Sequence, residues 1–158
     1  MPRLRRVLPA AALVSQALAL ALMSACGGDS GGGGSNGGKS SGGGTITLEG
    51  TPANNHGTKQ VTADSVEVEL GDYYFEPTIL VGKPGAKVKL ELVNNGELEH
   101  NINADVAQVG AAVPLDQDIR SGGGKETVEV TFPDSGQLVF FCKYHEGDGM
   151  VGALRAQP

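Results

Sequence analysis

Residues 137–155 read QLVFFCKYHEGDGMVGALR, in which two mostly apolar runs flank a short polar loop. Gln137 to Phe141 and Met150 to Arg155 are each predicted to form a strand. The chain therefore leaves one strand at Cys142 and enters the last strand at Met150. The residues between them must form a tight loop that joins the ends of two strands.

The sequence from Thr45 onward alternates apolar and polar residues in short runs that Gly, Pro and Asn interrupt. Such runs are typical of strands with one buried and one solvated face. The clearest apolar sets are Val66, Val68 and Leu70; Val88, Leu90 and Leu92; and Val128, Val130 and Phe132. We therefore expect an all-β fold, a Greek-key antiparallel β-sandwich of seven to eight strands.

Two segments of this region are less regular. Tyr73 to Val81, interrupted at Pro77, is predicted to be a strand or an edge with a bulge, because Pro is confined to such places in sheets. Ala104 to Val113 has room for a short helical turn. We expect no amphipathic helix of greater length. The apolar stretch from Val109 to Leu115 has no predicted role.

The loop carries three side chains that bind soft transition metals: the thiol of Cys142, the imidazole of His145 and the thioether of Met150. With His100 upstream, they make the ligand set of a blue-copper electron-transfer site, in which a weak axial Met completes a His₂Cys plane. His56 lies in a predicted loop without a matching motif. We therefore expect one copper ion that cycles between Cu(I) and Cu(II).

Other metal chemistries fit these residues less well. Zinc also binds Cys and His, but its structural sites use four donors without a thioether, and its catalytic sites keep an open position. A multicopper oxidase or reductase needs a second, His-rich cluster, and the chain has three His in all. We therefore expect no enzymatic activity.

The spacing Cys142-x-x-His145-x-x-x-x-Met150, with His100-Asn101 upstream, resembles the cupredoxin family, especially plastocyanin-like small blue copper proteins. The resemblance extends over residues 64–156. Its further motifs are Tyr74-Phe75-x-Pro77, Val81-Gly82-x-x-Gly85, the lead-in from Gly136 to Cys142, and Met150-Val151-Gly152. Leu138 departs from it, because many members carry Tyr there.

The resemblance implies contacts around the ligands. It implies that backbone N–H groups of Asn101 and Tyr144 donate hydrogen bonds to the Cys142 sulfur, and that the Asn101 side chain pins the two ligand loops together. It also implies a monomeric electron carrier whose redox partner docks where the edge of His145 reaches the surface.

Residues 1–25 resemble a bacterial lipoprotein signal peptide, because three Arg precede an apolar run from Val7 to Met23. The run ends in LMSAC, which is similar to a lipobox although Met23 stands where Leu is usual. We expect Cys26 to be lipidated and to tether the protein to a membrane surface. An ordinary signal cleaved near Ala25, which leaves Cys26 free, is the alternative.

Residues 26–44 are predicted to be a flexible linker, since 11 of the 18 residues from Gly27 to Gly44 are Gly. Its reach of about 20–25 Å would lift the copper-binding domain, residues 45–158, off the membrane. Lipid on Cys26 leaves Cys142 unpaired in an oxidising compartment, which indicates a reactive or liganded sulfur. A Cys26–Cys142 disulfide is the alternative.

Without the three arginines of the signal, the chain has 9 basic and 18 acidic side chains, a formal net charge of −9. Nucleic acid is therefore not an expected partner, whereas a positively charged redox protein is. Acidity also keeps a secreted protein soluble, so the charge alone does not decide this point. We expect the protein at the outer face of the cytoplasmic membrane or in the periplasm.

Three functions are compatible with these patterns. The first is a one-electron shuttle. The second is a copper carrier or chaperone, although delivery proteins tend to use open sites rich in Met or His, and one Met remains here after removal of the signal. The third is an adhesion sandwich whose loop resembles a copper site by coincidence.

Overall fold

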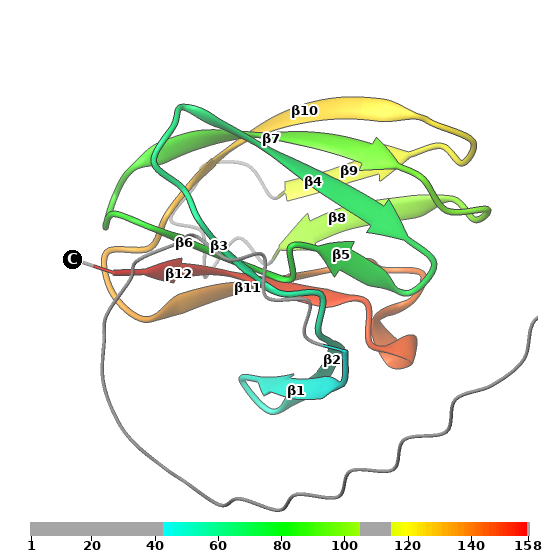
Figure 1. Ribbon diagram of the computed structural model, residues 1–158, viewed down its shortest axis with the longest axis horizontal. Coiled ribbons are helices and arrows are strands. Elements are labelled where there is room, and N and C mark those ends of the chain that lie inside the picture. The colour runs from blue at the N-terminus through cyan, green and yellow to red at the C-terminus, as the bar shows by residue number, and fades with distance from the viewer. Residues whose placement is uncertain (1–42, 105–114, 158) are drawn as a thin grey trace, which may run out of the picture. The chain divides into compact units, whose positions relative to one another are not determined.

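Residues 43–104 and 115–157 are the part of the chain that the computed structural model describes. They form two facing β-sheets and a small additional hairpin (Figure 1). The one helical segment described is the 3-10 turn η1 (Glu146–Asp148). None of the described helical structure is long and apolar enough to cross a membrane.

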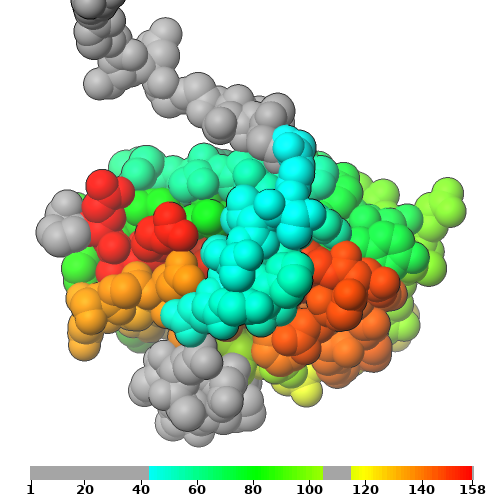
Figure 2. All heavy atoms as spheres, turned by 90° about the horizontal axis from the view of Figure 1, so that it is seen from below, coloured from blue at the N-terminus to red at the C-terminus, as the bar shows by residue number. Residues whose placement is uncertain are grey.

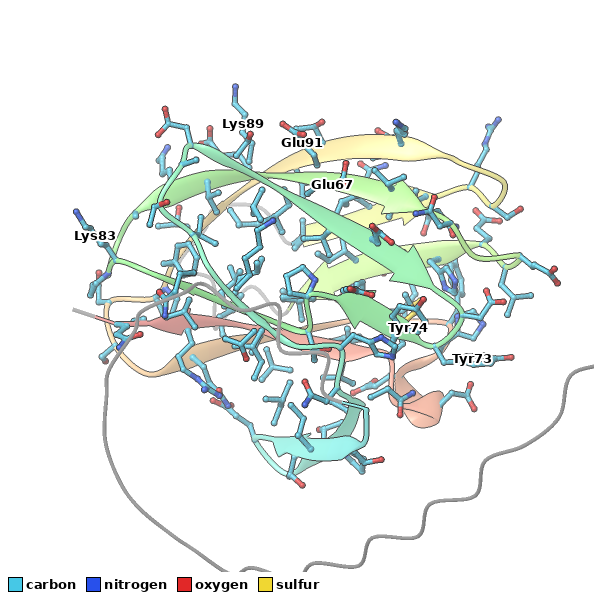
Figure 3. All side chains as sticks on the ribbon, viewed as in Figure 1. Glu67, Tyr73, Tyr74, Lys83, Lys89 and Glu91 are labelled. Atoms are coloured by element: carbon cyan, nitrogen blue, oxygen red, sulfur yellow. The ribbon has the colours of Figure 1, made fainter. Side chains whose placement is uncertain are left out.

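One sheet has four strands, and its outer face is charged. In spatial order these strands are β10 (Lys125–Thr131), β7 (Lys87–Asn94), β4 (Ser65–Gly71) and β5 (Tyr74–Glu76). Buried and exposed residues alternate along β4 and β7, as the period-two pattern predicts. Glu67, Lys89 and Glu91 point away from the core (Figure 3).

The second sheet has six strands and carries the predicted ligand loop. In spatial order they are β3 (Thr58–Gln60), β6 (Ile79–Gly82), β12 (Val151–Ala156), β11 (Gln137–Phe141), β8 (His100–Ala104) and β9 (Leu115–Ile119). β11 and β12 are antiparallel, with Phe141 opposite Val151. The ends of the intervening loop, Cys142 and Met150, therefore lie next to each other.

The core fills the space between the two sheets. Its buried residues come from the inner faces of both, and Cys142 and Met150 belong to the same apolar cluster. At its centre the rings of Phe75 and Phe140 meet edge to face, with centroids 5.0 Å apart. Each fully buried apolar side chain of this kind contributes about 1.5–3 kcal/mol, so the predicted ligand loop rests on a large apolar core.

The outer face of the six-stranded sheet is covered in part by a hairpin of β1 (Thr45–Leu48) and β2 (Thr51–Asn54) (Figure 1). Leu48 and Ala53 of this hairpin are buried in a second apolar cluster with Ile79, Val81, Val151 and Ala153. These sheet residues alternate with Leu80 and Leu154, which face the main core. The middle strands of this sheet are therefore buried on both faces.

The expected all-β sandwich is confirmed, with differences in detail. The sheets are mixed: β4 is parallel to β7, and β6 is parallel to both β3 and β12. Twelve strands occur within the described residues rather than seven to eight. Alternation shows which face of a strand is buried, but it carries no information on strand direction or pairing.

The irregular segments also differ from expectation. The run from Tyr73 to Val81 is not one strand with a bulge, because β5 belongs to the four-stranded sheet and β6 to the six-stranded sheet. The chain crosses between the sheets at Pro77 and Thr78. Of the segment predicted to hold a helical turn, Ala104 ends β8, and residues 105–113 lie outside the described residues.

Gly152→Ala is expected to lower the free energy of unfolding by about 1–3 kcal/mol. Gly152 pairs with Phe140 across the sheet, and a Cβ atom there would overlap the Phe140 ring and lie 2.9 Å from the carbonyl oxygen of Thr78. Urea unfolding of the metal-free protein measures the change. Gly147→Ala is the control, because nothing lies within 4 Å of its Cβ position; equal losses in both variants would contradict the packing argument.

Candidate metal centre

His100, Cys142 and His145, three of the predicted ligands, meet at one end of the sandwich. His100 is the first residue of β8, Cys142 directly follows β11, and His145 precedes η1. One donor atom from each lies within 4.8 Å of the other two. The two histidine Nδ1 atoms are 3.2 Å apart, and Cys142 Sγ is 3.6 Å from His145 Nδ1.

These spacings fit a single metal ion. Bonds of about 2.0 Å to nitrogen and about 2.3 Å to sulfur, arranged in a plane at 120°, place neighbouring donor atoms about 3.5–3.7 Å apart. The distances of 3.2 and 3.6 Å are close to these values. A soft thiolate with two imidazoles in such a plane is the donor set that copper prefers.

The loop that carries Cys142 and His145 is held by its own backbone. Cys142 N–H donates to Met150 O (3.0 Å), His145 N–H donates to Cys142 O (3.0 Å), and Met150 N–H donates to His145 O (3.1 Å). Gly149 adopts a left-handed conformation (φ +89°) that favours glycine and ends η1. Backbone hydrogen bonds and the conformation of Gly149 therefore define the shape of the loop.

The four predicted ligands differ in burial. His100, Cys142 and Met150 are fully buried, whereas His145 is half-buried. The rings of Tyr73 and Tyr144 meet the His145 ring edge-on, at centroid distances of 5.2 and 6.3 Å. Met150 is buried beside Cys142, and its role as the axial ligand stays a prediction.

Asp72 contacts His100 on the side away from the other donors. Its Oδ1 lies 3.4 Å from His100 Nε2 and accepts hydrogen bonds from the backbone N–H groups of Glu97 and Leu98. A carboxylate at one ring nitrogen fixes the orientation of the ring and leaves Nδ1 available to a metal. Burial lowers the pKa of His100, while the hydrogen bond that its ring donates to Asp72 opposes this shift.

A group of polar residues on β9 contacts the other side of the ligand loop. Lys143 Nζ lies 2.9 Å from Asp116 Oδ1 and 3.0 Å from Asp118 Oδ1, and the Tyr144 hydroxyl donates to Asp118 (3.1 Å). Lys143 lowers the pKa of both carboxyls, and the pKa of Lys143 is raised in turn. Since these groups are exposed, the ion pairs mainly orient the loop.

Asn101 is buried beneath this group. Its Nδ2 donates to Asp116 Oδ1 (2.8 Å) and Asp118 Oδ1 (2.9 Å), and its Oδ1 has no hydrogen-bond partner among the described residues. The side chain thus connects to the ligand loop through the two carboxylates, which Lys143 also contacts. The expected N–H donors to the sulfur, at Asn101 and Tyr144, stay predictions.

Three carboxylates near the site were not predicted from the sequence: Asp72, Asp116 and Asp118. Asp116 and Asp118 alternate with Gln117, so the period-two pattern places both carboxylates on one face of the strand. This was a weak sequence signal that the two carboxylates act together. Asp72 lies in a turn between strands and has no periodic signal. His56 lies in a loop, as predicted, but it is half-buried and stacks on Tyr74, with ring centroids 3.6 Å apart.

The sequence is similar to those of known copper-binding proteins. The family model of copper binding proteins, plastocyanin/azurin family, matches residues 62–157. The plastocyanin of Nostoc punctiforme is 33% identical over 115 residues, which cover 63% of this chain and 79% of that protein. The plastocyanin minor isoform of Arabidopsis thaliana is 32% identical over 89 residues, and the chain spans about half of its length (51%).

A solved structure with a similar backbone is the reduced auracyanin of Roseiflexus castenholzii. It has a TM-score of 0.47 and 22% sequence identity, and the alignment covers 61% of this chain and 98% of that one.

The family match spans more than half of the chain and contains all the donors described above. The chain therefore belongs to the plastocyanin/azurin family of copper-binding proteins, and copper is its metal cofactor.

Proposed function

We propose that this protein is a one-electron carrier whose single type 1 copper is bound by His100, Cys142, His145 and Met150. The observation that carries the proposal is the convergence of three donor atoms, one each from His100, Cys142 and His145, within 4.8 Å of one another. Of these residues, His145 is half-buried. When bound, copper supplies a one-electron Cu(II)/Cu(I) couple.

The residues of the chain contribute rigidity and exclusion of water. Cu(II) and Cu(I) prefer different geometries, so a carrier works best with donors that keep one arrangement in both states. Here the buried side chains of His100, Cys142 and Met150 belong to or adjoin the core, and the loop backbone is hydrogen-bonded to itself. We also propose that N–H groups of Asn101 and Tyr144 donate to the thiolate and stabilise the reduced state.

The surface around His145 supports a role in docking. The large hydrophobic residues that are exposed within the described segments are Tyr73 (40%), Leu98 (37%) and Tyr144 (49%). Both tyrosine rings contact the His145 ring, and Leu98 N–H donates to Asp72, which contacts His100. Tyr73 points outward from this end of the molecule (Figure 3). Electron exchange would therefore occur through the edge of His145.

Copper delivery is the second candidate function. A delivery protein must release the ion, whereas three of the four proposed ligands here are fully buried. The closed loop and the buried thioether favour retention of copper. We propose no enzymatic reaction, because an electron carrier needs no substrate site.

Titration of the metal-free protein with one equivalent of Cu(II) is expected to produce an intense visible band from thiolate-to-copper charge transfer. Cys142→Ser is expected to abolish the band, because the serine hydroxyl cannot replace the thiolate. Absorption spectroscopy measures both, and Cys26→Ser is the matched control that keeps the band. An unchanged colour in Cys142→Ser would exclude the proposed site.

Chelator competition separates the two candidate functions with the same sample. For a carrier of electrons, a reversible voltammetric wave is expected, with copper retained in the presence of excess EDTA. Rapid loss of copper to EDTA would instead support delivery.

The rate of electron exchange is expected to depend on salt in a direction set by the charge of the reagent. Since the chain without its signal carries a formal net charge of −9, the rate constant with a cationic metal complex should fall as ionic strength rises, and that with an anionic complex should rise. Stopped-flow kinetics at several salt concentrations measure both. Equal salt dependence for the two reagents would argue against electrostatic steering by the net negative charge.

We further propose that the protein is exported and anchored through lipid on Cys26, with residues 26–44 as a flexible tether. Residues 1–42 lie outside the described residues, so this proposal depends on the sequence pattern. Mass spectrometry of the purified membrane fraction is expected to find an N-terminal peptide that begins with lipid-modified Cys26. Cys26→Ser should release the protein from the membrane, whereas Cys142→Ser should not; an unmodified N-terminus at or before Cys26 would contradict the anchor.

A further inference from the structure

Asn54, the last residue of β2, makes three hydrogen bonds to segments around the metal centre. Both hydrogens of its side-chain amide are used: Nδ2 donates to Tyr73 O (2.9 Å) and to Asp148 O (2.9 Å). Its backbone N–H donates to Gly149 O (2.9 Å). Asn54 lies outside residues 62–157, the part of the chain that matches the family model.

The acceptors of these bonds lie directly beside the proposed ligands. Asp148 and Gly149 immediately precede Met150, the proposed axial ligand. Tyr73 contacts the ring of His145, the half-buried donor. Asn54 therefore connects the end of the ligand loop with the segment that supports His145 from the opposite sheet.

The fit between Asn54 and the loop is close. Gly149 has a positive φ of +89°, and a Cβ atom at this position would lie 3.0 Å from the side-chain amide of Asn54. Glycine therefore serves two purposes here: it permits the left-handed backbone, and it lets the amide approach the loop.

Asn54 itself is held in place by the packing of its hairpin and by a hydrogen bond from Thr78. The hairpin β1–β2 buries Leu48 and Ala53 against the outer face of the six-stranded sheet. The carbonyl oxygen of Asn54 accepts a hydrogen bond from Thr78 Oγ1 (3.0 Å), a buried residue between β5 and β6. In the space-filling view the hairpin (cyan) lies against the segment that carries the ligand loop (orange) (Figure 2).

We infer that Asn54 is a positioning residue of the copper site: through its two side-chain hydrogen bonds, the hairpin holds the loop from His145 to Met150 closed around the ion. This inference rests on the proposed copper site. The hairpin is thus a brace for the ligand loop in addition to a cover for the sheet. Without the brace, the loop opens more often, Met150 moves relative to Cys142, and copper escapes faster.

The first test uses the metal-free, full-chain protein. Asn54→Ala removes both side-chain bonds and leaves the backbone bond to Gly149 in place. Loss of two hydrogen bonds of ordinary strength is expected to raise the loop-opening equilibrium about tenfold. Amide hydrogen exchange should therefore accelerate about tenfold at Met150 and Cys142, whose N–H groups close the loop, with no change in β7 and β10.

The second test uses the copper-loaded protein. In Asn54→Ala, copper loss to excess EDTA is expected to be about tenfold faster than in the parent, and the reduction potential is expected to shift, because the axial ligand tunes it. Asn54→Asp is a second variant of nearly the same shape whose carboxylate donates no hydrogen bond, and it should behave as Asn54→Ala does.

Asn55→Ala is the matched control. Asn55 is the next residue, and its side chain accepts a hydrogen bond from Gly57 N–H within its own turn. It should leave the loop exchange rates, the potential and the rate of copper loss unchanged. Uniformly faster exchange throughout the sandwich in both Asn54 variants, or no change at the loop amides, would overturn the inference. Failure of the parent to develop the charge-transfer band would instead reject the copper site, and the exchange data on the metal-free protein would still test the brace.

Discussion

The hydrogen bond from Cys142 N–H to Met150 O closes the ligand loop at its base, and the positions of the proposed donors depend on it. It exists because β11 and β12 are neighbouring antiparallel strands, so the residue after one strand lies opposite the residue before the other. A loop with fixed ends and few residues has little freedom. Met150 N–H then donates to His145 O, which brings the middle of the loop back toward its base.

The sandwich supports this loop from both sides with different chemistry. On one side, Asp116 and Asp118 of β9 contact Lys143 and Tyr144 near the start of the loop. On the other side, Asn54 of β2 contacts the carbonyl groups near its end. Exposed ion pairs contribute little to stability and are screened by salt, whereas the hydrogen bonds of Asn54 join neutral groups. The loop is thus restrained near both ends while the ring of His145 remains partly accessible.

Local patterns predicted which residues would be buried. The alternating sets that begin at Val66 and Val88 face the core, because period two is a property of a single strand and needs no knowledge of its neighbours. The same patterns did not predict strand pairing. β4 and β7 are parallel and not antiparallel, and the run from Tyr73 to Val81 divides between two sheets. The hairpin β1–β2 has strands of four residues each, too short for alternation to show that it forms a third layer.

The types and order of the proposed donors on the loop follow from the sequence alone, since Cys142, His145 and Met150 lie on one short segment between two apolar runs, and contiguity in the chain guarantees proximity in space. Every contact between that loop and residues distant in the chain depends on the tertiary structure. His100 approaches because β8 lies beside β11, Asp72 approaches from the facing sheet, and Asn54 approaches from a hairpin on the outer face. Such contacts depend on which strands pair and how sheets stack, and these are cooperative properties of the whole core that no local pattern of residues contains.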